Sequence, residues 1–288
     1  MSQNFYKNKD LLNIPWVESP FFLNLLKSSK ATKELKRLAK KYHEDGYVVI
    51  DLKLKDDFIK KINSDIDDKI KKNEIKKNPK IYHYNQSPRI VEAWKFSKSV
   101  AQLALNSKIH KILNFFYQKK PLPISTLNFI RGTEQPLHSD YMHFATIPER
   151  YLAGVWIALE DTNKFNGALT VVPKSHQFPI VDFNSFNLKK PDSIKSLEKC
   201  YRVYENYVNK LILAKQLKSK KIYIKKGQAI IWAANLLHGG SKLLNNKLTR
   251  RSQVVHYHFK NCKKYFNPGF SIPLENDYAI RKLDIVHK

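Results

Sequence analysis

The feature that most constrains the fold is a run of short, β-rich segments in the second half of the chain. They lie between residues 124 and 259 and are separated by Gly, Pro, Asn or Asp: ISTLNFIRG, LHSDYMHF, LAGVWIALED, GALTVVP, KIYIKKG, QAIIWAAN and SQVVHYHF. Their β-branched and aromatic residues favour strands, and the separating turn residues keep each strand short. This pattern predicts a jelly roll or a similar sandwich.

The residues before this run have a different pattern. Residues 32–45 predict a helix that ends at Gly46. Residues 56–72 predict an amphipathic helix, because their apolar residues recur at spacings of three and four. A further helical region is expected over residues 98–118, and residues 47–52 (YVVIDL) predict a short strand. The sequence therefore predicts a mainly β protein with a helical flank.

We expect the 288 residues to form a single domain, since this length provides ample room for one large core. It would comprise an N-terminal arm (1–30), a mainly helical flank (31–120), a jelly-roll core (121–262) and a C-terminal tail (263–288). An insert at about 174–220 is rich in Lys, Asn and Ser, and we expect it to cover one mouth of the sheet domain.

The net charge of +27 raises the question of a nucleic-acid partner. Only eight of the 52 basic residues are Arg, whereas nucleic-acid surfaces favour Arg for bidentate and stacked contacts. The lysines are spread along the whole chain in company with many Asn and Ile. We interpret these lysines as part of a solvated surface. Nucleic acid is therefore not the favoured partner.

The sequence also limits the compartment. The first residues lack the apolar segment of a signal peptide, and no apolar run approaches the length of a membrane span. The two cysteines, Cys200 and Cys262, allow one disulfide but form neither a disulfide framework nor a cysteine metal site. We therefore expect a cytoplasmic protein with no membrane partner.

Two candidate metal ligands lie in PLHSDYMHF, residues 136–144. His138 and Asp140 are two residues apart, so on a strand their side chains would point to the same side. His43 and Asp45 have the same spacing, but they lie at the end of a predicted helix, where residues two apart do not face one another. The spacing alone is a weak signal. The strand context favours His138 and Asp140.

A third candidate ligand, His238, follows the apolar segment IIWAANLL and precedes two glycines. Two imidazoles and one carboxylate form the facial triad typical of non-haem Fe(II) oxygenases, and they leave coordination positions open. Such sites usually bind 2-oxoglutarate, whose free carboxylate is best held by a fork-shaped Arg. Arg250, at the start of SQVVHYHF, is the predicted partner of that carboxylate, and Arg251 is the second choice.

Four segments together resemble the phytanoyl-CoA dioxygenase family. They are YHEDGYVVID, LNFIRGTEQPLHSDYMHF, GVWIALEDTNKFNGALTVVPKSH, and WAANLLHGGS with the later TRRSQVVHY. The similarity covers about residues 40–262 and keeps the order of the family's motifs. It implies a double-stranded β-helix, which is a cupin-like jelly roll, and an enzyme that uses Fe(II), 2-oxoglutarate and O₂.

The resemblance also implies residue roles. His138, Asp140 and His238 match the iron ligands of the family, and Arg250 matches its 2-oxoglutarate arginine. Halogenating relatives replace the carboxylate by a small residue, so the presence of Asp140 implies hydroxylation. The family acts on many small molecules, so the sequence does not select a substrate. Our hypothesis is a small or medium anionic metabolite.

Other residues are weaker candidates for the site. Asn128 matches a family position that reaches the cosubstrate, and Gln135 matches a recurrent position next to the first ligand. Gly240 stands where some relatives have a Ser that touches the cosubstrate. Tyr141 and His143 follow the His-x-Asp pair, and they are candidates for contact with the substrate.

Several further residues have structural interpretations. Trp156 and Trp232 lie in apolar strand segments and are assigned to the core. His176, in PKSH, is expected to bind backbone in a turn. His256 and His258 form a same-face pair on the last predicted strand. They could bind zinc together with His138, but we expect them to line the barrel or to lie outside it.

Two other functions fit parts of the sequence. A non-catalytic or zinc-binding jelly roll would bind a sugar or a partner, retain zinc tightly and show no 2-oxoglutarate turnover. A nucleic-acid-modifying oxygenase would bind DNA or RNA with a salt-dependent affinity. The Lys-rich, Arg-poor surface disfavours the second alternative.

Overall fold

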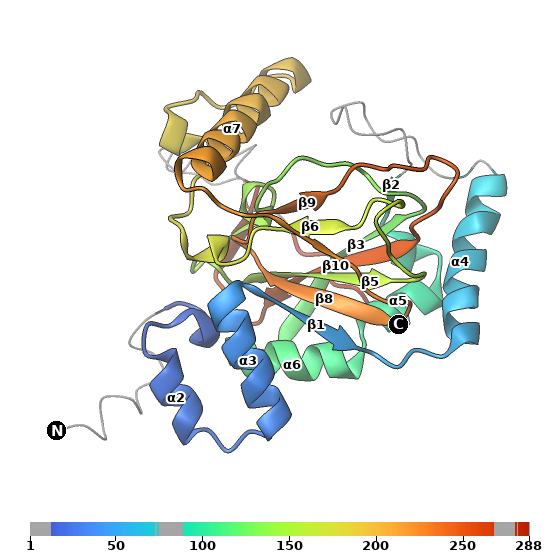
Figure 1. Cartoon of the computed structure of the whole chain (residues 1–288), viewed down its shortest axis with the longest axis horizontal. Coiled ribbons are helices and arrows are strands. Elements are labelled where there is room, and N and C mark those ends of the chain that lie inside the picture. Colours follow the sequence, from blue (N-terminus) through green and yellow to red (C-terminus); the bar gives the residue numbers. More distant parts are fainter. Residues whose placement is uncertain (1–12, 73, 75–88, 268–279, 281, 288) are drawn as a thin grey trace.

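The computed structural model describes residues 13–72, 74, 89–267, 280 and 282–287, and its centre is a six-stranded antiparallel sheet (Figure 1). The strands follow the order β1-β8-β5-β10-β3-β2, so neighbours in space are distant in the sequence. Their bounds are β1 (Tyr47–Asp51), β2 (Arg89–Val91), β3 (Pro121–Phe129), β5 (Leu152–Ala158), β8 (Gln228–Ala233) and β10 (Ser252–Phe259). This connectivity is typical of a jelly roll.

A smaller sheet packs against the large one across an apolar layer. Its order is β7-β6-β9, and a separate two-stranded sheet pairs β11 with β4. The bounds are β4 (Ala145–Ile147), β6 (Leu169–Val171), β7 (Lys220–Ile222), β9 (His238–Gly240) and β11 (Lys264–Phe266). Trp156, Trp232, Leu169 and Val171 belong to one buried cluster between the two sheets. The predicted jelly-roll core is therefore confirmed.

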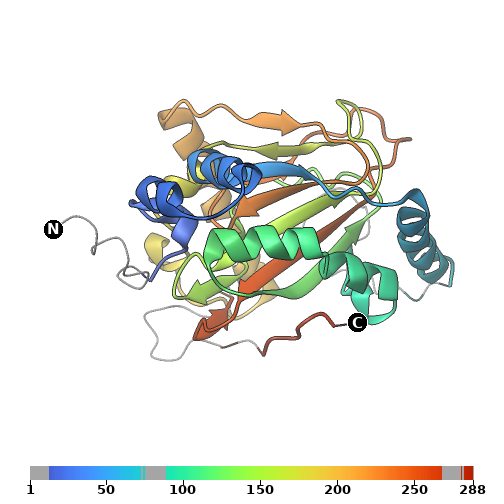
Figure 2. The same ribbon diagram turned by 90° about the horizontal axis from the view of Figure 1, so that it is seen from below.

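Helices cover the opposite face of the large sheet. Because side chains alternate along a strand, Val155, Val255 and Tyr257 join a second buried cluster that is shared with the helices. Figure 2 shows α6 lying across this face. The helical elements are η1 (Trp16–Glu18), α2 (Phe22–Ser28), α3 (Lys33–Asp45), α4 (Asp56–Lys71), η2 (Ala93–Lys95), α5 (Lys98–Ala104) and α6 (Ser107–Tyr117).

The helical flank follows the sequence prediction with one difference. Helix α3 ends at Gly46, whose φ of 81° is the left-handed conformation that glycine adopts without strain. The region expected over residues 98–118 is divided into α5 and α6. Asn106 causes the division, because its side chain accepts hydrogen bonds from the backbone N–H groups of Lys108 and Ile109 and so starts a new helix.

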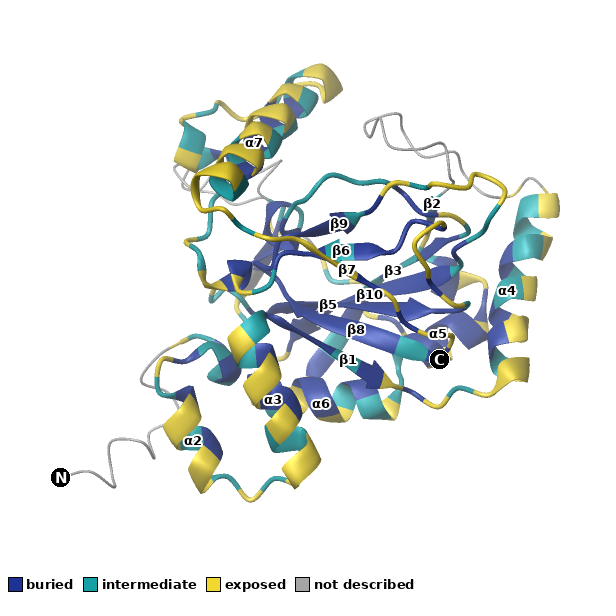
Figure 3. Ribbon diagram, viewed as in Figure 1, coloured by how far each residue is buried: buried dark blue, intermediate teal, exposed yellow. Residues whose placement is uncertain are grey.

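The insert between β6 and β7 contains a long helix that the sequence analysis did not predict. Helix α7 spans Ile194–Ala214, and η4 (Ser175–Gln177) and η5 (Asn184–Phe186) precede it. Its buried residues Leu197, Cys200, Tyr204 and Val208 lie three or four apart, so they form one face, and the outer face is largely exposed (Figure 3). The buried face packs against Met142, Val172 and Leu237.

The segment LHSDYMHF is not the strand that the sequence predicts. His138 makes a single bridge to His238, and Asp140–Met142 forms a 3-10 helix, η3. The backbone N–H of Ser139 donates to the Tyr204 hydroxyl of α7 at 3.0 Å, which removes it from any strand ladder. The N–H groups of His143 and Phe144 both donate to the Asp140 carbonyl. The backbone therefore turns at Asp140, two residues after His138.

Within the described residues, no helix is both long enough and apolar enough to cross a membrane. Cys200 and Cys262 are both free, so the disulfide that two cysteines allow is not formed.

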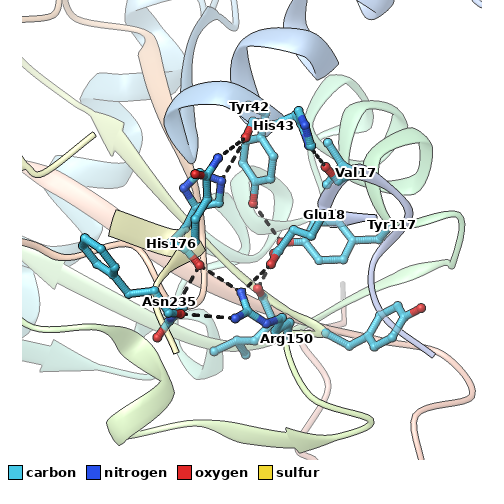
Figure 4. Close-up of polar contacts among 12 residues, drawn as sticks. Val17, Glu18, Tyr42, His43, Tyr117, Arg150, His176 and Asn235 are labelled. Carbon is cyan, nitrogen blue, oxygen red and sulfur yellow. Dashed lines mark hydrogen bonds and ion pairs between the residues drawn. The ribbon is translucent and has the colours of Figure 1, made fainter. Parts of the chain in front are cut away.

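A buried polar network joins the N-terminal elements to η4 and to Arg150, which precedes β5 (Figure 4). The Nε2 of His176 donates to the carbonyl oxygen of His43 at 3.0 Å, which agrees with its predicted structural role. Arg150 Nη1 donates to Glu18 Oε2 at 2.8 Å and to the His176 carbonyl at 2.9 Å. Burial nevertheless raises the pKa of the Glu18 carboxyl above its ordinary value, against the influence of Arg150. The network anchors η1 and the end of α3 to η4.

Because the His176 imidazole is buried, we expect the protein to lose stability in acid. Burial lowers its pKa from 6.5 to about 4, although the bond to the His43 carbonyl works in the opposite direction. Between these values the unfolded chain binds more protons, so the stability that is present above pH 6.5 falls as the pH falls towards 4. A difference of this size corresponds to roughly 3 kcal/mol. Urea unfolding from pH 7 to pH 4 should show the decline.

The matched variant is His176→Gln, because glutamine can still donate to the His43 carbonyl but does not titrate. It should make the decline of unfolding free energy with falling pH shallower by up to about 3 kcal/mol. An unchanged slope in this variant would mean that His176 does not titrate differently in the folded and unfolded states.

Candidate metal centre

His138 and His238 face each other across the bridge that joins their backbones. Each residue's N–H donates to the other's carbonyl oxygen at 2.9 Å. The Nδ1 of His138 lies 2.8 Å from the Pro136 carbonyl, and the Nδ1 of His238 lies 2.9 Å from the Leu236 carbonyl. A carbonyl only accepts, so each Nδ1 carries the proton and each Nε2 presents a lone pair. Metal-binding histidines have this arrangement.

Glycines allow β9 to come close to the loop before His138. A Cβ on Gly239 would lie 2.6 Å from the Gln135 carbonyl oxygen, and one on Gly240 would lie 2.8 Å from the Glu134 nitrogen. Neither glycine has a positive φ. The two glycines after His238 therefore serve this close approach.

Asp140 completes the group. It is 3 % exposed, and its Oδ1 lies 3.5 Å from His238 Nε2. Ligand atoms of His138, Asp140 and His238 all lie within 4.8 Å of one another. Burial alone would raise the pKa of Asp140, but the nearby His238 and His256 outweigh it and hold the pKa well below the usual range. The carboxylate is therefore ionised, and the three side chains could hold one divalent metal.

The three side chains open into a cavity of about 290 Å³, which also contains Arg250. Arg250 is 3 % exposed, and its guanidinium lies over the Trp156 ring at 5.1 Å. Its Nη2 donates to the Arg131 carbonyl at 3.3 Å, while its Nε has no hydrogen-bond partner. Burial lowers the pKa of Arg250 to about 10, so it stays protonated at neutral pH. A buried cation with an unsatisfied donor is suited to bind an anion.

Arg251, the second choice for the same role, points elsewhere. Its Nη2 forms an ion pair with Asp67 at 2.9 Å, and its backbone N–H donates to Glu160. It does not line the cavity. The alternation of side chains near the start of β10 separates the two arginines.

The structure brings Gln135 into the cavity but not Asn128. The Gln135 amide lies 3.1 Å from His138 Nε2 and accepts a hydrogen bond from Arg89 at 2.9 Å. Asn128 is fully buried on the helix-covered face of β3, where its Nδ2 donates to Gln253 Oε1 at 3.4 Å. Its neighbours Leu127 and Phe129 line the cavity instead.

The two candidates for substrate contact are also separated. His143 lines the cavity, and its Nδ1 lies 2.9 Å from the Tyr201 hydroxyl of α7. Burial lowers the pKa of His143 to about 4. Tyr141 is buried in an apolar cluster with Ala145 and Phe266, and it is not among the cavity-lining residues.

The structure adds Arg89 and Trp232 to the site, and it places there His256, one of the two histidines expected to line the barrel or to lie outside it. Arg89, from β2, lines the cavity, and the scarcity of Arg in this chain could have marked it. Trp232, assigned to the core, donates from Nε1 to Asp140 Oδ2 at 2.7 Å. His256 lies with its Nε2 3.5 Å from the same oxygen. The even-numbered positions Val254 and His256 line the cavity together with Arg250.

Comparison with known protein families agrees with this geometry. The model of the phytanoyl-CoA dioxygenase family matches residues 42–252. Among curated proteins, the peroxisomal phytanoyl-CoA dioxygenase of Rattus norvegicus is 24% identical over 163 residues. This alignment covers 55% of the present chain and 42% of the rat protein.

Solved structures with the same fold include two proteins that have each been determined with bound iron. The epimerase SnoN, determined in complex with Fe3+, alpha ketoglutarate and nogalamycin RO, has a TM-score of 0.63 and 16% identity, and the match covers 88% of this chain and 96% of that one. EctD from S. alaskensis, determined with 2-oxoglutarate and 5-hydroxyectoine, has a TM-score of 0.63 and 16% identity, with 89% and 88% of the chains covered. These likenesses support the jelly-roll fold.

Proposed function

Because the chain belongs to the phytanoyl-CoA dioxygenase family of enzymes that use non-haem iron and 2-oxoglutarate, we propose specific residues for this chemistry. His138, Asp140 and His238 hold Fe(II). Arg250 binds the distal carboxylate of 2-oxoglutarate. The reaction is the hydroxylation of an unactivated C–H bond in a small or medium anionic metabolite.

The donor set supports Fe(II) at the three side chains. Both imidazoles are kept in the tautomer that offers Nε2, and Asp140 supplies an ionised carboxylate. Two borderline nitrogen donors and one hard oxygen suit Fe(II), and three ligands leave positions for a cosubstrate and O₂. With 2-oxoglutarate bound, such a centre activates O₂ for insertion of one oxygen atom into a C–H bond.

The observation that carries the proposal is Arg250 in the same cavity as the candidate ligands. Within the described residues it forms no ion pair with a carboxylate, and one of its donors is unsatisfied. The guanidinium lies over the Trp156 ring, and the Arg250 side chain is buried. A dicarboxylate that reached the metal position with one end and Arg250 with the other would satisfy both groups. Gln135 is a further candidate for contact with the cosubstrate.

Charge in the cavity supports an anionic substrate. Arg89 and Arg250 are both in the lining, whereas Asp140 is the only carboxylate among the described residues there. Arg89 lies 5.9 Å from the Phe129 ring and contacts Gln135. If Arg250 binds the cosubstrate, Arg89 is positioned to attract the acidic group of the substrate. Apolar lining residues, including Leu127, Phe144 and Leu169, would contact its carbon skeleton.

Loss of the Arg89 charge should weaken substrate binding selectively. With an acidic substrate found by screening carboxylates, phosphates and their neutral analogues for succinate release, Arg89→Gln should raise KM by roughly 10-fold or more. The dissociation constant of 2-oxoglutarate should stay the same. The matched control is Arg202→Gln, which removes an exposed charge from α7. A weakened affinity for 2-oxoglutarate in Arg89→Gln would instead assign Arg89 to the cosubstrate.

Product analysis distinguishes hydroxylation from other outcomes on the same fold, which is also found in a carbocyclase and an epimerase. With ¹⁸O₂, hydroxylation adds one labelled oxygen atom to the product. Cyclisation would remove two hydrogen atoms, and epimerisation would leave the mass unchanged. Either of these outcomes would contradict hydroxylation, but the assignment of Fe(II) and 2-oxoglutarate to the cavity would stand.

A further inference from the structure

One contact to Asp140 is not explained by metal binding itself. The indole Nε1 of Trp232 donates to Asp140 Oδ2 at 2.7 Å. The other oxygen, Oδ1, is the one that lies near His238 Nε2. Both Trp232 and Asp140 are almost completely buried, so the hydrogen bond is formed to an ionised group away from water. Such charge-assisted bonds are strong and directional.

The sheet makes room for this indole at one position. Gly154 of β5 pairs with Trp232 on one side and with His256 on the other. A Cβ on Gly154 would lie 2.2 Å from Cε2, 2.3 Å from Cζ2 and 2.5 Å from Nε1 of the Trp232 indole. Gly154 has no positive φ, so its backbone would accept another residue. The indole therefore lies directly over the bare Cα of Gly154.

His256 reinforces the same arrangement from the neighbouring strand. Its Nε2 lies 3.5 Å from Asp140 Oδ2, and its Nδ1 lies 2.9 Å from the Ser125 hydroxyl. Two rings from β8 and β10 thus approach Oδ2 across Gly154, and Oδ1 is left near the Nε2 of His238. This asymmetry fixes the rotation of the carboxylate.

We propose that Trp232 is a positioning residue that makes Asp140 bind the metal through Oδ1 alone, and that Gly154 is glycine in order to admit the indole. The inference rests on the proposed iron centre. A carboxylate that bound through both oxygens would occupy a further coordination position, and with two histidines it would leave two positions in place of three. Two remaining positions would not accommodate a chelating cosubstrate and O₂ together.

The test measures metal affinity in the absence of 2-oxoglutarate, by competition of Co(II) with a chelating dye. Trp232→Phe keeps an aromatic ring but removes the donor, and it should weaken Co(II) binding by roughly 10- to 100-fold. Trp94→Phe is the matched control, because the Trp94 indole also donates to a carboxylate, Glu92 Oε2 at 2.5 Å, outside the cavity. It should leave the Co(II) affinity unchanged.

Gly154→Ala tests the second half of the proposal with the indole still present. It should weaken Co(II) binding to a similar degree, and combining it with Trp232→Phe should add little, since both changes remove one interaction. Additive losses in the double variant would contradict the role assigned to Gly154.

A spectroscopic readout separates positioning from general stability. The chain has four tryptophans, so ¹⁵N-labelled indole groups give four N–H resonances in the metal-free protein. The resonance that Trp232→Phe removes should be the one that moves most in Asp140→Ala and in Gly154→Ala. If wild type binds Co(II) and Trp232→Phe binds it equally well, the positioning role is wrong and the iron centre stands. If wild type binds no metal, the proposed function fails as well.

Discussion

Replacement of His238 by alanine is expected to abolish turnover and to weaken metal binding by at least roughly 100-fold, which exceeds the usual effect of losing an outer contact of a ligand. The imidazole provides one of the three donor atoms that lie within 4.8 Å of one another. Its removal leaves Asp140 and His138 as an incomplete site. The measurement is Co(II) or anaerobic Fe(II) titration, together with succinate release in the presence of a substrate.

The chain provides its own control for this experiment. His43 and Asp45 repeat the His-x-Asp spacing, but His43 lies near the end of α3, and its Nδ1 is bonded to the Val17 carbonyl. His43→Ala should leave the metal affinity unchanged. Equal losses in His43→Ala and His238→Ala would indicate an effect on folding rather than on the metal centre.

Replacement of Arg250 by leucine should produce the second large effect. Leucine keeps part of the apolar bulk and removes the buried guanidinium, so the distal carboxylate of 2-oxoglutarate loses its partner. We expect the dissociation constant of 2-oxoglutarate to increase by roughly 100-fold or more, equivalent to about 3 kcal/mol. Metal affinity without cosubstrate should stay close to that of wild type. Isothermal titration of the Co(II)-loaded protein with 2-oxoglutarate measures the first quantity. Titration of the metal-free protein with Co(II) measures the second.

Arg251→Leu is the matched control for Arg250→Leu. It removes a neighbouring guanidinium that is paired with Asp67 outside the cavity. Partly exposed pairs of this kind usually contribute about 1 kcal/mol or less to stability. The affinity for 2-oxoglutarate should not change. If Arg251→Leu weakened the binding of 2-oxoglutarate as much as Arg250→Leu does, Arg250 would be the wrong residue for the carboxylate partner.

The jelly roll was predictable because its signals are local. Residue types that favour strands, the turn residues between them and the alternation within SQVVHYHF all lie in short segments. His138 and His238 were predictable as a pair because each follows an apolar segment. Helix α7 had a readable signal as well, since its buried residues Leu197 and Cys200 begin a regular helical spacing.

The remaining features depend on contacts between distant segments. The turn at Asp140 requires the Tyr204 hydroxyl, which lies 65 residues from Ser139 in the sequence. The apolar neighbours of Trp232 in the sequence favour a position in the core. The residue that accepts its indole N–H, Asp140, is 92 residues away in the sequence. Such contacts have no local signature.

Asn128 illustrates how strand register decides a side chain's role. It pairs with Gln253, and odd-numbered positions of β10 face the helices, whereas Arg250, Val254 and His256 line the cavity. The resemblance to the family implies that Asn128 reaches the cosubstrate, whereas the alternation of side chains directs it to the other face. A one-residue difference in register separates the two expectations.

Whether this cavity is an oxygenase centre can be tested by an anaerobic titration of the wild-type protein with Fe(II) and 2-oxoglutarate, followed through the weak visible charge-transfer band of the chelated complex. We expect a band that saturates at one iron and one 2-oxoglutarate per chain, is absent in His238→Ala, and requires far more 2-oxoglutarate in Arg250→Leu. Wild-type protein that binds iron by metal analysis and yet develops no band would contradict the assignment of this cavity as an oxygenase centre.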